Sequence, residues 1–202
     1  MDPNTIYPNT PYSSPTPPPK SFFDNLGTHI IDFIQTLVVF GAIFAILYLF
    51  VAQFHKVSGN SMFPTYHNGD FLVTEKLSYR FGEPKRGDVI VLKNPRDESQ
   101  DFIKRVIGLP GDSIKIAEDF VYINGKKVNE TYLPSGTPTH SGAFLTEGTT
   151  VSIGDDQYFV LGDNRNHSSD SREWGGITKK DIIGRAFFRY WPPQDIGLLG
   201  NR

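Results

Sequence analysis

An uncharged stretch of 22 residues near the N-terminus, residues 33–54, constrains the fold of this chain most strongly. Asp32 precedes the stretch, and His55 and Lys56 follow it. A helix of this length, rising about 1.5 Å per residue, covers roughly 33 Å and matches the roughly 30 Å hydrocarbon layer of a bilayer. The stretch is apolar on all sides rather than along one stripe, which suits lipid better than a soluble surface. We therefore expect a transmembrane anchor helix over residues 29–55.

Two alternatives for this stretch are less consistent with the sequence. A cleavable signal peptide has a shorter apolar core, a basic start and small residues at its cleavage site, whereas no Ala-x-Ala follows here. A buried helix of a soluble domain is the second alternative, but 22 uncharged residues are long for such a helix. The distribution of basic residues does not fix the orientation, because Lys20 precedes the stretch and Lys56 follows it.

The remaining composition restricts the class of protein. Residues 1–20 contain seven of the fifteen prolines, which predicts a disordered Pro-rich tail over residues 1–28. The net charge of −2 gives no field that would attract nucleic acid. The absence of cysteine excludes disulfide scaffolds and cysteine nucleophiles, and the five scattered histidines show no metal-ligand spacing. We expect no metal site, no cofactor and no nucleic-acid partner.

Beyond Lys56, short apolar segments alternate with turn signals, which indicates an antiparallel β domain, either a barrel or a sandwich. The Asn124-Gly125 pair between extended flanks predicts a hairpin. Strands are predicted at residues 71–73, 88–92, 101–107, 121–128, 158–161 and 183–190. Residues 109–157, which are richer in Gly, Thr, Ser and Asp, predict an inserted β subdomain. The main β core would then comprise residues 57–108 and 158–193, followed by a C-terminal tail at 194–202.

The predicted strand at residues 101–107 places a cation on each of its faces. Lys104 lies between Phe102 and Val106 on one face, and Arg105 lies on the other. An exposed edge strand explains one such cation but explains two less easily. Burial would lower the pKa of a lysine from roughly 10.4 towards about 7, where a neutral amine can act as a general base. Lys104 is therefore a candidate base.

A candidate nucleophile lies shortly after the apolar stretch. Ser61 follows Gly59, which permits close backbone approach, and precedes Pro64, which fixes the chain beyond it. A serine nucleophile needs exposure, a nearby base and backbone N–H groups that bind the oxyanion. The alternative is a turn without catalytic function, since Ser, Gly, Asn and Pro are common turn residues.

A third segment, residues 162–175, is dense in polar groups and predicts a hydrogen-bonded loop beside a site. The hydroxyl of Ser168 could orient a neutral amine. Asp170 and Arg172 could form a bidentate pair that braces the loop. A solvated turn is the alternative for this segment taken alone.

Together these segments resemble the type I signal peptidase (bacterial leader peptidase) family. Four boxes occur in the family's order and cover most of residues 57–191. They are Ser61-Met62-x-Pro64-Thr65, Arg86-Gly87-Asp88-Val89, the run from Lys104 to Asp112, and Gly162-Asp163-Asn164-Arg165 followed by Ser168, Asp170, Ser171 and Arg172. The resemblance implies a mostly β fold, in which an antiparallel β catalytic core carries a smaller inserted β subdomain and one N-terminal transmembrane helix.

The resemblance also implies a Ser–Lys dyad and its supporting residues. Ser61 would be the nucleophile and Lys104 the general base, with Ser168 hydrogen-bonded to the lysine and Asp170 and Arg172 as the bracing pair. A Ser–His–Asp triad of Ser61, His167 and Asp170 is the alternative. It is disfavoured because the histidine and the aspartate would have to meet within one loop, and Lys104 would have no function.

Substrate contacts follow from the same resemblance. Met62, Phe102 and Ile103 match positions that line pockets for small side chains. The oxyanion would be held by backbone N–H groups of Ser61 and Gly59. Some family members carry a hydroxyl two residues before the nucleophile, where this chain has Gly59. Substrate would bind as an extended strand near Phe102.

The implied function is that of a membrane-bound serine endopeptidase that removes signal peptides from secreted preproteins at Ala-x-Ala-like sites. Its partners would be preprotein signal peptides, membrane lipid and the secretion machinery. Phe63 and Tyr66 are the candidate contacts with lipid. The protein would cross the bacterial cell membrane once, with a cytoplasmic N-terminus and an extracytoplasmic catalytic domain. One alternative is a Ser–Lys peptidase with another dedicated substrate. The other is a non-catalytic membrane-anchored β-domain binding module, which would be expected to lack Ser61 or Lys104.

Overall fold

The computed structural model describes residues 22–199, and the chain divides between Phe44 and Ala45 into two units. Helix α1 spans Phe22–Phe50, and its segment Leu26–Phe50 has a mean hydropathy of 2.4 and is long and apolar enough to cross a membrane. Residues 1–21 of the predicted Pro-rich tail lie outside the described residues, whereas residues 22–28 belong to α1. The helix therefore begins earlier than expected.

The predicted anchor also ends earlier than residue 55. Strand β1 (Ala52–Lys56) follows α1 directly and pairs antiparallel with β2 (Phe71–Glu75), with Phe54 opposite Val73. Apolar composition alone cannot reveal this change of structure, because a strand requires a partner edge that lies some twenty residues further along the chain. Residues 52–56 are therefore part of the β domain and not of the helix.

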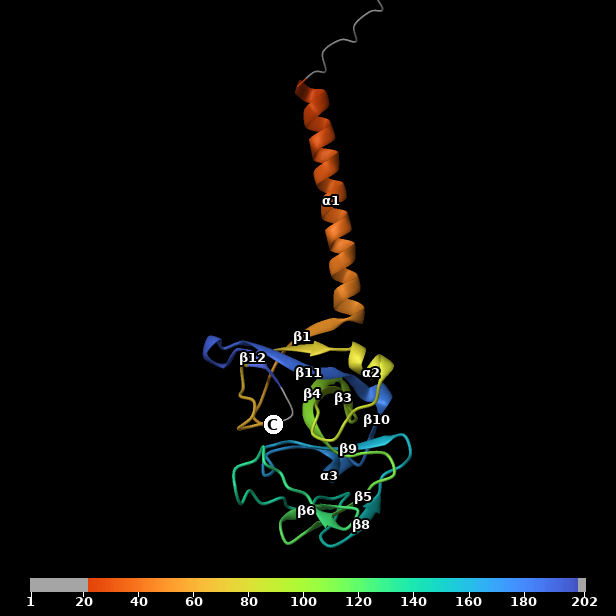
Figure 1. Cartoon of the computed structure of the whole chain (residues 1–202), viewed down its shortest axis with the longest axis vertical. Helices are drawn as coiled ribbons and strands as arrows, with labels where there is room; N and C mark the ends of the chain where they lie inside the picture. The colour runs from red at the N-terminus through yellow and green to blue at the C-terminus, as the bar shows by residue number, and fades with distance from the viewer. Residues whose placement is uncertain (1–21, 200–202) are drawn as a thin grey trace, which may run out of the picture. The chain divides into compact units, whose positions relative to one another are not determined.

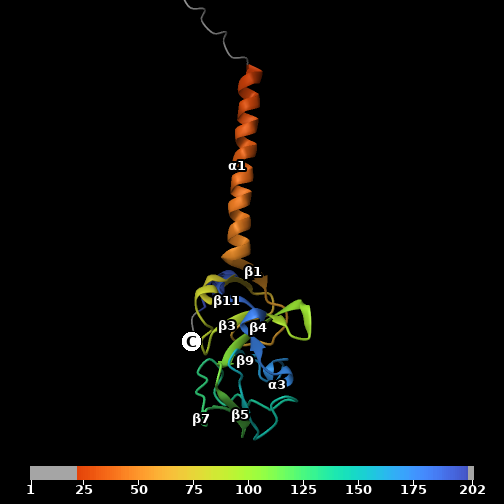
Figure 2. The same cartoon turned by 90° about the vertical axis from the view of Figure 1, so that its right-hand side faces the viewer.

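The main sheet has eight strands and is antiparallel at every pairing, as the sequence predicted (Figures 1 and 2). Its order is β1-β2-β11-β3-β4-β9-β10, with β12 paired to β11. The further strands of this sheet are β3 (Val89–Asn94), β4 (Asp97–Gly108), β9 (Gln157–Leu161), β10 (Ile177–Thr178), β11 (Ile182–Trp191) and β12 (Gly197–Leu198). The predicted C-terminal tail thus contributes a strand, β12, to the sheet.

A second, four-stranded sheet lies within the range predicted for the inserted segment. Its order is β7-β6-β5-β8, and its strands are β5 (Ser113–Ala117), β6 (Phe120–Ile123), β7 (Lys126–Lys127) and β8 (Thr150–Ser152). Asn124 and Gly125 connect β6 to β7 with φ angles of 50° and 77°, as the predicted tight hairpin requires. Both sheets belong to one compact unit, which begins at Ala45.

Short helical segments complete this unit. They are α2 (Leu77–Phe81), α3 (Ser171–Trp174) and two 3₁₀ turns, η1 (Lys179–Asp181) and η2 (Pro193–Asp195). The N-terminus of α3 is capped by Asp170, whose side chain accepts a hydrogen bond from the Arg172 N–H.

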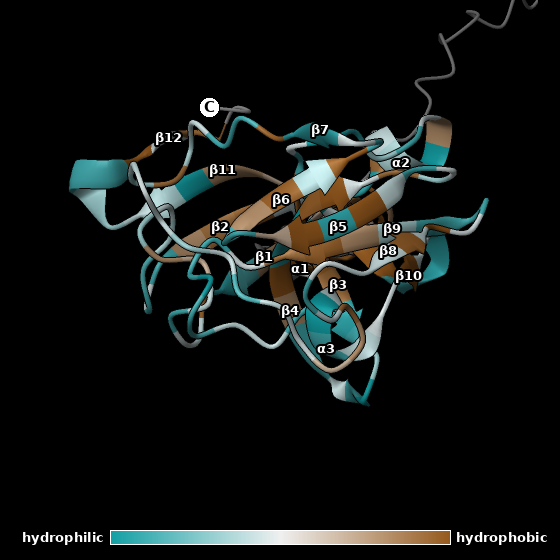
Figure 3. Cartoon of the chain, turned by 90° about the horizontal axis from the view of Figure 1, so that it is seen from below, coloured by the Kyte–Doolittle hydropathy of each residue, from teal (hydrophilic) through white to brown (hydrophobic). Residues whose placement is uncertain are grey.

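In the unit that begins at Ala45, hydrophobic residues are concentrated along the strands, whereas many of the connecting loops are polar (Figure 3). Buried side chains form three clusters, one of which surrounds β5, β6 and β9 and another the β3–β4 hairpin. The third contains Val57, Met62, Tyr66, Leu72, Val89 and Ala186. This third cluster fixes the loop between β1 and β2, because four of its members come from that loop or its flanking strand.

Strand β4 places the residues of the predicted site. It lies between β3 and β9, so that Lys104 is opposite Ile90 and Arg105 is opposite Leu161, the last residue of β9. Lys104 and Arg105 are each only 2% exposed. The strand therefore buries one cation on each of its two faces, and each must find a partner or lose its charge.

Candidate active site

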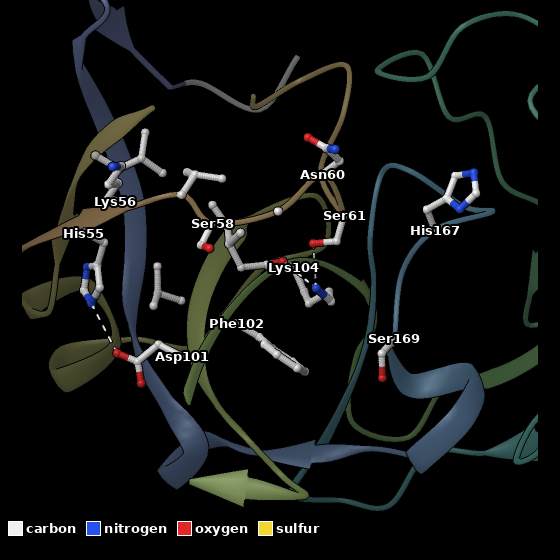
Figure 4. A pocket seen from close by; sticks show the side chains of 15 residues that line it. His55, Lys56, Ser58, Asn60, Ser61, Asp101, Phe102, Lys104, His167 and Ser169 are labelled. Atoms are coloured by element: carbon white, nitrogen blue, oxygen red, sulfur yellow. Dashed lines mark hydrogen bonds and ion pairs between the residues drawn. The ribbon is translucent and has the colours of Figure 1, made fainter. Parts of the chain in front are cut away.

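The loop between β1 and β2 meets β4 at the two predicted catalytic residues. Lys104 Nζ lies 2.9 Å from Ser61 Oγ and donates a second hydrogen bond of 3.0 Å to the carbonyl oxygen of Ile103. Figure 4 shows the hydroxyl and the amine directed towards each other at the base of a pocket. A serine hydroxyl within hydrogen-bond reach of a buried amine is the arrangement that a nucleophile and its base require.

Burial lowers the pKa of the Lys104 amine to about 8. Loss of solvation is the main cause, because the ammonium form is the charged one, while the carboxylates of Asp170 and Asp163 oppose the shift. The Phe102 ring, centred 4.8 Å from Nζ, forms part of the surroundings of the amine. A substantial fraction of Lys104 is therefore neutral near physiological pH and able to accept a proton.

The two backbone N–H groups expected to hold the oxyanion differ in availability. The Ser61 N–H makes no hydrogen bond within the described residues, whereas the Gly59 N–H donates to the Asn68 side-chain oxygen at 3.0 Å. Gly59 adopts a φ of 91°, which glycine tolerates best. Of the two predicted oxyanion donors, only the Ser61 N–H is available in this structure.

The polar loop that follows β9 contains the predicted bracing pair. Arg172 donates two parallel hydrogen bonds to Asp170, of 2.8 and 2.9 Å, and Asp170 has no exposed surface. Asp170 also accepts from the Gly162 N–H at 3.0 Å, and Arg172 donates to the Arg165 carbonyl at 2.7 Å. The pair therefore ties the start of the loop to its end.

A second buried pair, which sequence reasoning missed, connects this loop to β4. Arg105 donates two hydrogen bonds of 2.9 and 2.7 Å to Asp163, and the Thr65 hydroxyl donates to the same carboxylate at 2.5 Å. Asp163, in the polar loop, is thus bonded both to β4, which carries Lys104, and to the loop between β1 and β2, which carries Ser61. The only sequence signal for this pair was the unexplained cation on the second face of β4.

Ser168 is hydrogen-bonded neither to Ser61 nor to Lys104 in the structure. Its Oγ is buried and makes no hydrogen bond within the described residues, whereas the family resemblance implies a bond to Lys104. A Cβ placed on Gly162 would lie 2.2 Å from Ser168 Oγ and 2.5 Å from the Ser61 carbonyl oxygen. Ser168 and Ser61 therefore pack against the same glycine, which cannot carry a side chain.

The alternative Ser–His–Asp triad is not assembled. His167 is exposed, and Figure 4 shows its ring directed away from Ser61 and Lys104. Asp170, its proposed partner, is already paired with Arg172.

The pocket above the pair has a volume of about 310 Å³ and an elongated lining that runs from β1 to the polar loop (Figure 4). Of the three residues proposed to contact substrate, Phe102 and Ile103 line this pocket, whereas Met62 is 1% exposed and packs into the core. Tyr66, a predicted lipid contact, is 2% exposed and also belongs to the core, whereas Phe63 is 48% exposed. The spacing of residues after Ser61 did not reveal that Met62 and Tyr66 are buried and anchor the loop between β1 and β2 in the core.

The chain is similar in sequence to proteins of one known family. The family model described as "Signal peptidase, peptidase S26" matches residues 30–191. The chain belongs to this signal peptidase family. It is therefore a serine peptidase that removes signal peptides, and its substrates are the signal peptides of preproteins.

Individual relatives cover much of the chain. A "Probable signal peptidase I-2" from Synechocystis is 42% identical over 74% of this chain and 68% of its own length. A "Probable signal peptidase I-1" from the same organism is 38% identical over 94% and 93%. A crystal structure of a signal peptidase I from Enterococcus faecalis is 30% identical, covers 51% of this chain and 96% of its own, and has a TM-score of 0.43.

Proposed function

We propose that Ser61 and Lys104 are the catalytic dyad of this signal peptidase, and that it cleaves secreted preproteins after Ala-x-Ala-like sequences. The observation that carries this assignment is the 2.9 Å contact between Ser61 Oγ and a Lys104 amine that is 2% exposed. Burial supplies the neutral amine, and the contact supplies its proton donor.

The reaction follows from these positions. The neutral Lys104 amine accepts the Ser61 proton while Oγ bonds to the scissile carbonyl carbon, and the Ser61 N–H stabilises the resulting oxyanion. The tetrahedral intermediate collapses with cleavage of the C–N bond, and the Lys104 ammonium protonates the departing amine. Water, deprotonated by the again neutral Lys104, then attacks the ester carbonyl carbon. When the C–O bond to Ser61 breaks, the Lys104 ammonium returns the proton to Ser61 Oγ and the signal peptide's carboxylate is released.

The surrounding residues support the dyad in defined ways. Asp170 and Arg172 hold the polar loop against it through their two-bond pair. Ser168 supplies a buried hydroxyl that has no hydrogen-bond partner within the described part of the chain, and we propose that it binds the Lys104 amine. Phe102 and Ile103 line a pocket of about 310 Å³, a size suited to small side chains on an extended substrate strand.

The apolar helix supports a membrane anchor in this proposal. Leu26–Phe50 is long and apolar enough to span a bilayer once. We propose that it crosses the bacterial cell membrane with the N-terminus cytoplasmic and the catalytic unit on the other side. A preprotein held by its own signal helix would then share the bilayer with the enzyme, which raises their effective concentration. Contact with lipid, for which the half-exposed Phe63 is the remaining candidate, and with the secretion machinery belongs to the same proposal.

Cleavage of a model preprotein by the full chain in detergent or liposomes tests the dyad. Ser61→Ala and Lys104→Ala should each abolish cleavage, because the first removes the nucleophile and the second removes its base, while circular dichroism remains that of the folded protein. His167→Ala, the matched control for the triad, should retain most of the activity. Near-normal turnover by Lys104→Ala would refute the dyad, and complete loss in His167→Ala would favour the triad instead.

A further inference from the structure

Asn164, in the polar loop, contacts the peptide groups on both sides of the nucleophile. Its side-chain Nδ2 donates to the Asn60 carbonyl oxygen at 3.0 Å, and its backbone N–H donates to the Ser61 carbonyl oxygen at 3.0 Å. One residue therefore holds both carbonyl groups that flank the residue carrying the reactive hydroxyl.

The bond from the Asn164 side chain to the Asn60 carbonyl oxygen controls the direction of the Ser61 N–H, which the reaction needs. The Asn60 carbonyl and the Ser61 N–H belong to the same planar trans peptide, so their directions are opposed and fixed relative to each other. The Asn60 carbonyl also accepts from the Phe63 N–H at 3.1 Å, within its own loop. The bond from Asn164 is the contact that orients this peptide relative to the rest of the site, and hence relative to Lys104.

The Ser61 N–H is the group whose direction matters most. It makes no hydrogen bond within residues 22–199, and the neighbouring Gly59 N–H is already bonded to Asn68. Since the Gly59 N–H is taken, the Gly59 donor cannot compensate for a misaligned Ser61 N–H, and misalignment should weaken the stabilisation of the oxyanion.

Asn164 is itself held in place by its neighbours in sequence. Asp163 on one side forms the buried pair with Arg105, and Arg165 on the other side forms an ion pair with Glu130 and bonds to Thr139. Asn164 is therefore presented from a rigid backbone and not from a mobile loop, as a positioning contact requires.

We propose that Asn164 is a positioning residue, which orients the Asn60–Ser61 peptide so that the Ser61 N–H points at the developing oxyanion. This inference rests on the proposed function, since it assumes that Ser61 is the nucleophile. Asn164 does not contact substrate in this role; it acts through the peptide that does.

The experiment measures kcat and KM separately for a model preprotein cleaved by the full chain in liposomes. Asn164→Ala should lower kcat by about 10- to 100-fold with little change in KM, because a misaligned donor weakens only the transition state. Asn164→Gln, which keeps an amide donor on a longer side chain, should recover part of the loss. The apparent pKa of the kcat/KM profile should be unchanged, because Lys104 is untouched.

A matched control separates this role from a merely structural one. Asn94 accepts a 3.0 Å hydrogen bond from the Arg96 N–H in the β3–β4 hairpin, so Asn94→Ala removes a similar contact away from the dyad. It should leave kcat near the wild-type value even if it lowers the melting temperature. A peptide boronate, whose serine adduct is tetrahedral, should lose affinity for Asn164→Ala, whereas an uncleavable substrate peptide should not.

Three results would overturn the inference: wild-type kcat in Asn164→Ala, a rise in KM with unchanged kcat, or equal losses of boronate and peptide affinity. These results are distinguishable from failure of the proposed function. If the wild-type protein does not cleave preprotein, or if Ser61→Ala cleaves it normally, the dyad itself is wrong and the inference falls with it.

Discussion

At the scale of single residues, the chemistry of the site depends on the protonation of Lys104. The amine must be neutral to accept the Ser61 proton, and burial lowers its pKa to about 8. Below this pKa the neutral fraction falls with falling pH, and above it the fraction approaches one. Activity should therefore increase with pH on the acidic side of the pKa.

The pH dependence of kcat/KM tests this assignment. The free enzyme should show an acidic limb that rises through a pKa of about 8 and then levels off. The limb should persist in His167→Ala, which excludes that histidine as its source. A flat profile from about pH 6 to about pH 9 would argue against a lysine base.

The close approach at Gly162 gives a second prediction at this scale. A Cβ in Gly162→Ala would lie 2.5 Å from the Ser61 carbonyl oxygen, a backbone atom that cannot move without moving the nucleophile. We expect kcat to fall by about 100-fold or more, because small displacements of reacting groups are costly. Preprotein cleavage assays measure this loss.

Gly154→Ala provides the matched control, since its Cβ would meet only the flexible Gln157 side chain, at 3.3 Å. This variant should cleave preprotein normally. Wild-type activity in Gly162→Ala would show that the site tolerates a separation of Ser61 from the polar loop, and the described packing would then be irrelevant to catalysis.

The sequence indicates some of the proposed site residues and misses others for a physical reason. Ser61 and Lys104 were proposed through the family resemblance of four ordered boxes, because each segment alone also fits a turn or an edge strand, whereas the possible pairing of Asp170 with Arg172 follows from their closeness in one loop. The bond between Arg105 and Asp163 joins residues 58 positions apart, so only the folded chain reveals it. Met62 was proposed for the pocket through the family resemblance alone, and a motif match does not indicate which side chains of an irregular loop point inwards.

At the scale of secondary structure elements, the strands with clear turn signals were predictable. The segments at 71–73, 88–92, 158–161 and 183–190 correspond to β2, β3, β9 and β11. Strand β1 was not predictable, because its residues continue an apolar helix and its partner β2 lies beyond an irregular loop. The short β12 carries no pattern of its own, and its pairing with β11 defines it.

The buried pair between β4 and the polar loop predicts a large effect on stability. Asp163→Ala leaves the Arg105 guanidinium, whose side chain is 3% exposed, without its carboxylate. The free energy of unfolding should fall by about 3–5 kcal/mol, the usual cost of removing one partner of a buried ion pair. Urea unfolding, monitored by circular dichroism, measures this change.

An exposed pair provides the comparison for this variant. Lys179→Ala removes the partner of Glu83 from a pair whose side chains are 39% and 67% exposed. Its cost should be about 1 kcal/mol or less, because solvent screens exposed charges. Equal costs for the two variants would mean that the Arg105–Asp163 pair does not hold the loop to the strand.

At the scale of the whole molecule, the proposal requires that α1 crosses the membrane once. The chain has no cysteine, so single cysteines can be introduced without interference from native thiols. Ser135→Cys, at an exposed position of the catalytic unit, should react with a membrane-impermeant maleimide in intact cells. Ser13→Cys, before the helix, should react only after the membrane is permeabilised.

The opposite labelling pattern would reverse the proposed orientation. Labelling of both cysteines in intact cells would show that the apolar helix does not separate the two segments.

The catalytic pair is tested most directly by identifying the residue that reacts with a serine-directed phosphonylating agent near pH 8. Mass spectrometry of the wild-type protein should find one adduct, on Ser61, since among the hydroxyls of residues 22–199 only that of Ser61 is bonded to a partly neutral buried amine, at 2.9 Å. Lys104→Met, which keeps an unbranched side chain but removes the amine, should remain unlabelled. An adduct on another residue, or undiminished labelling of Ser61 in Lys104→Met, would contradict the dyad.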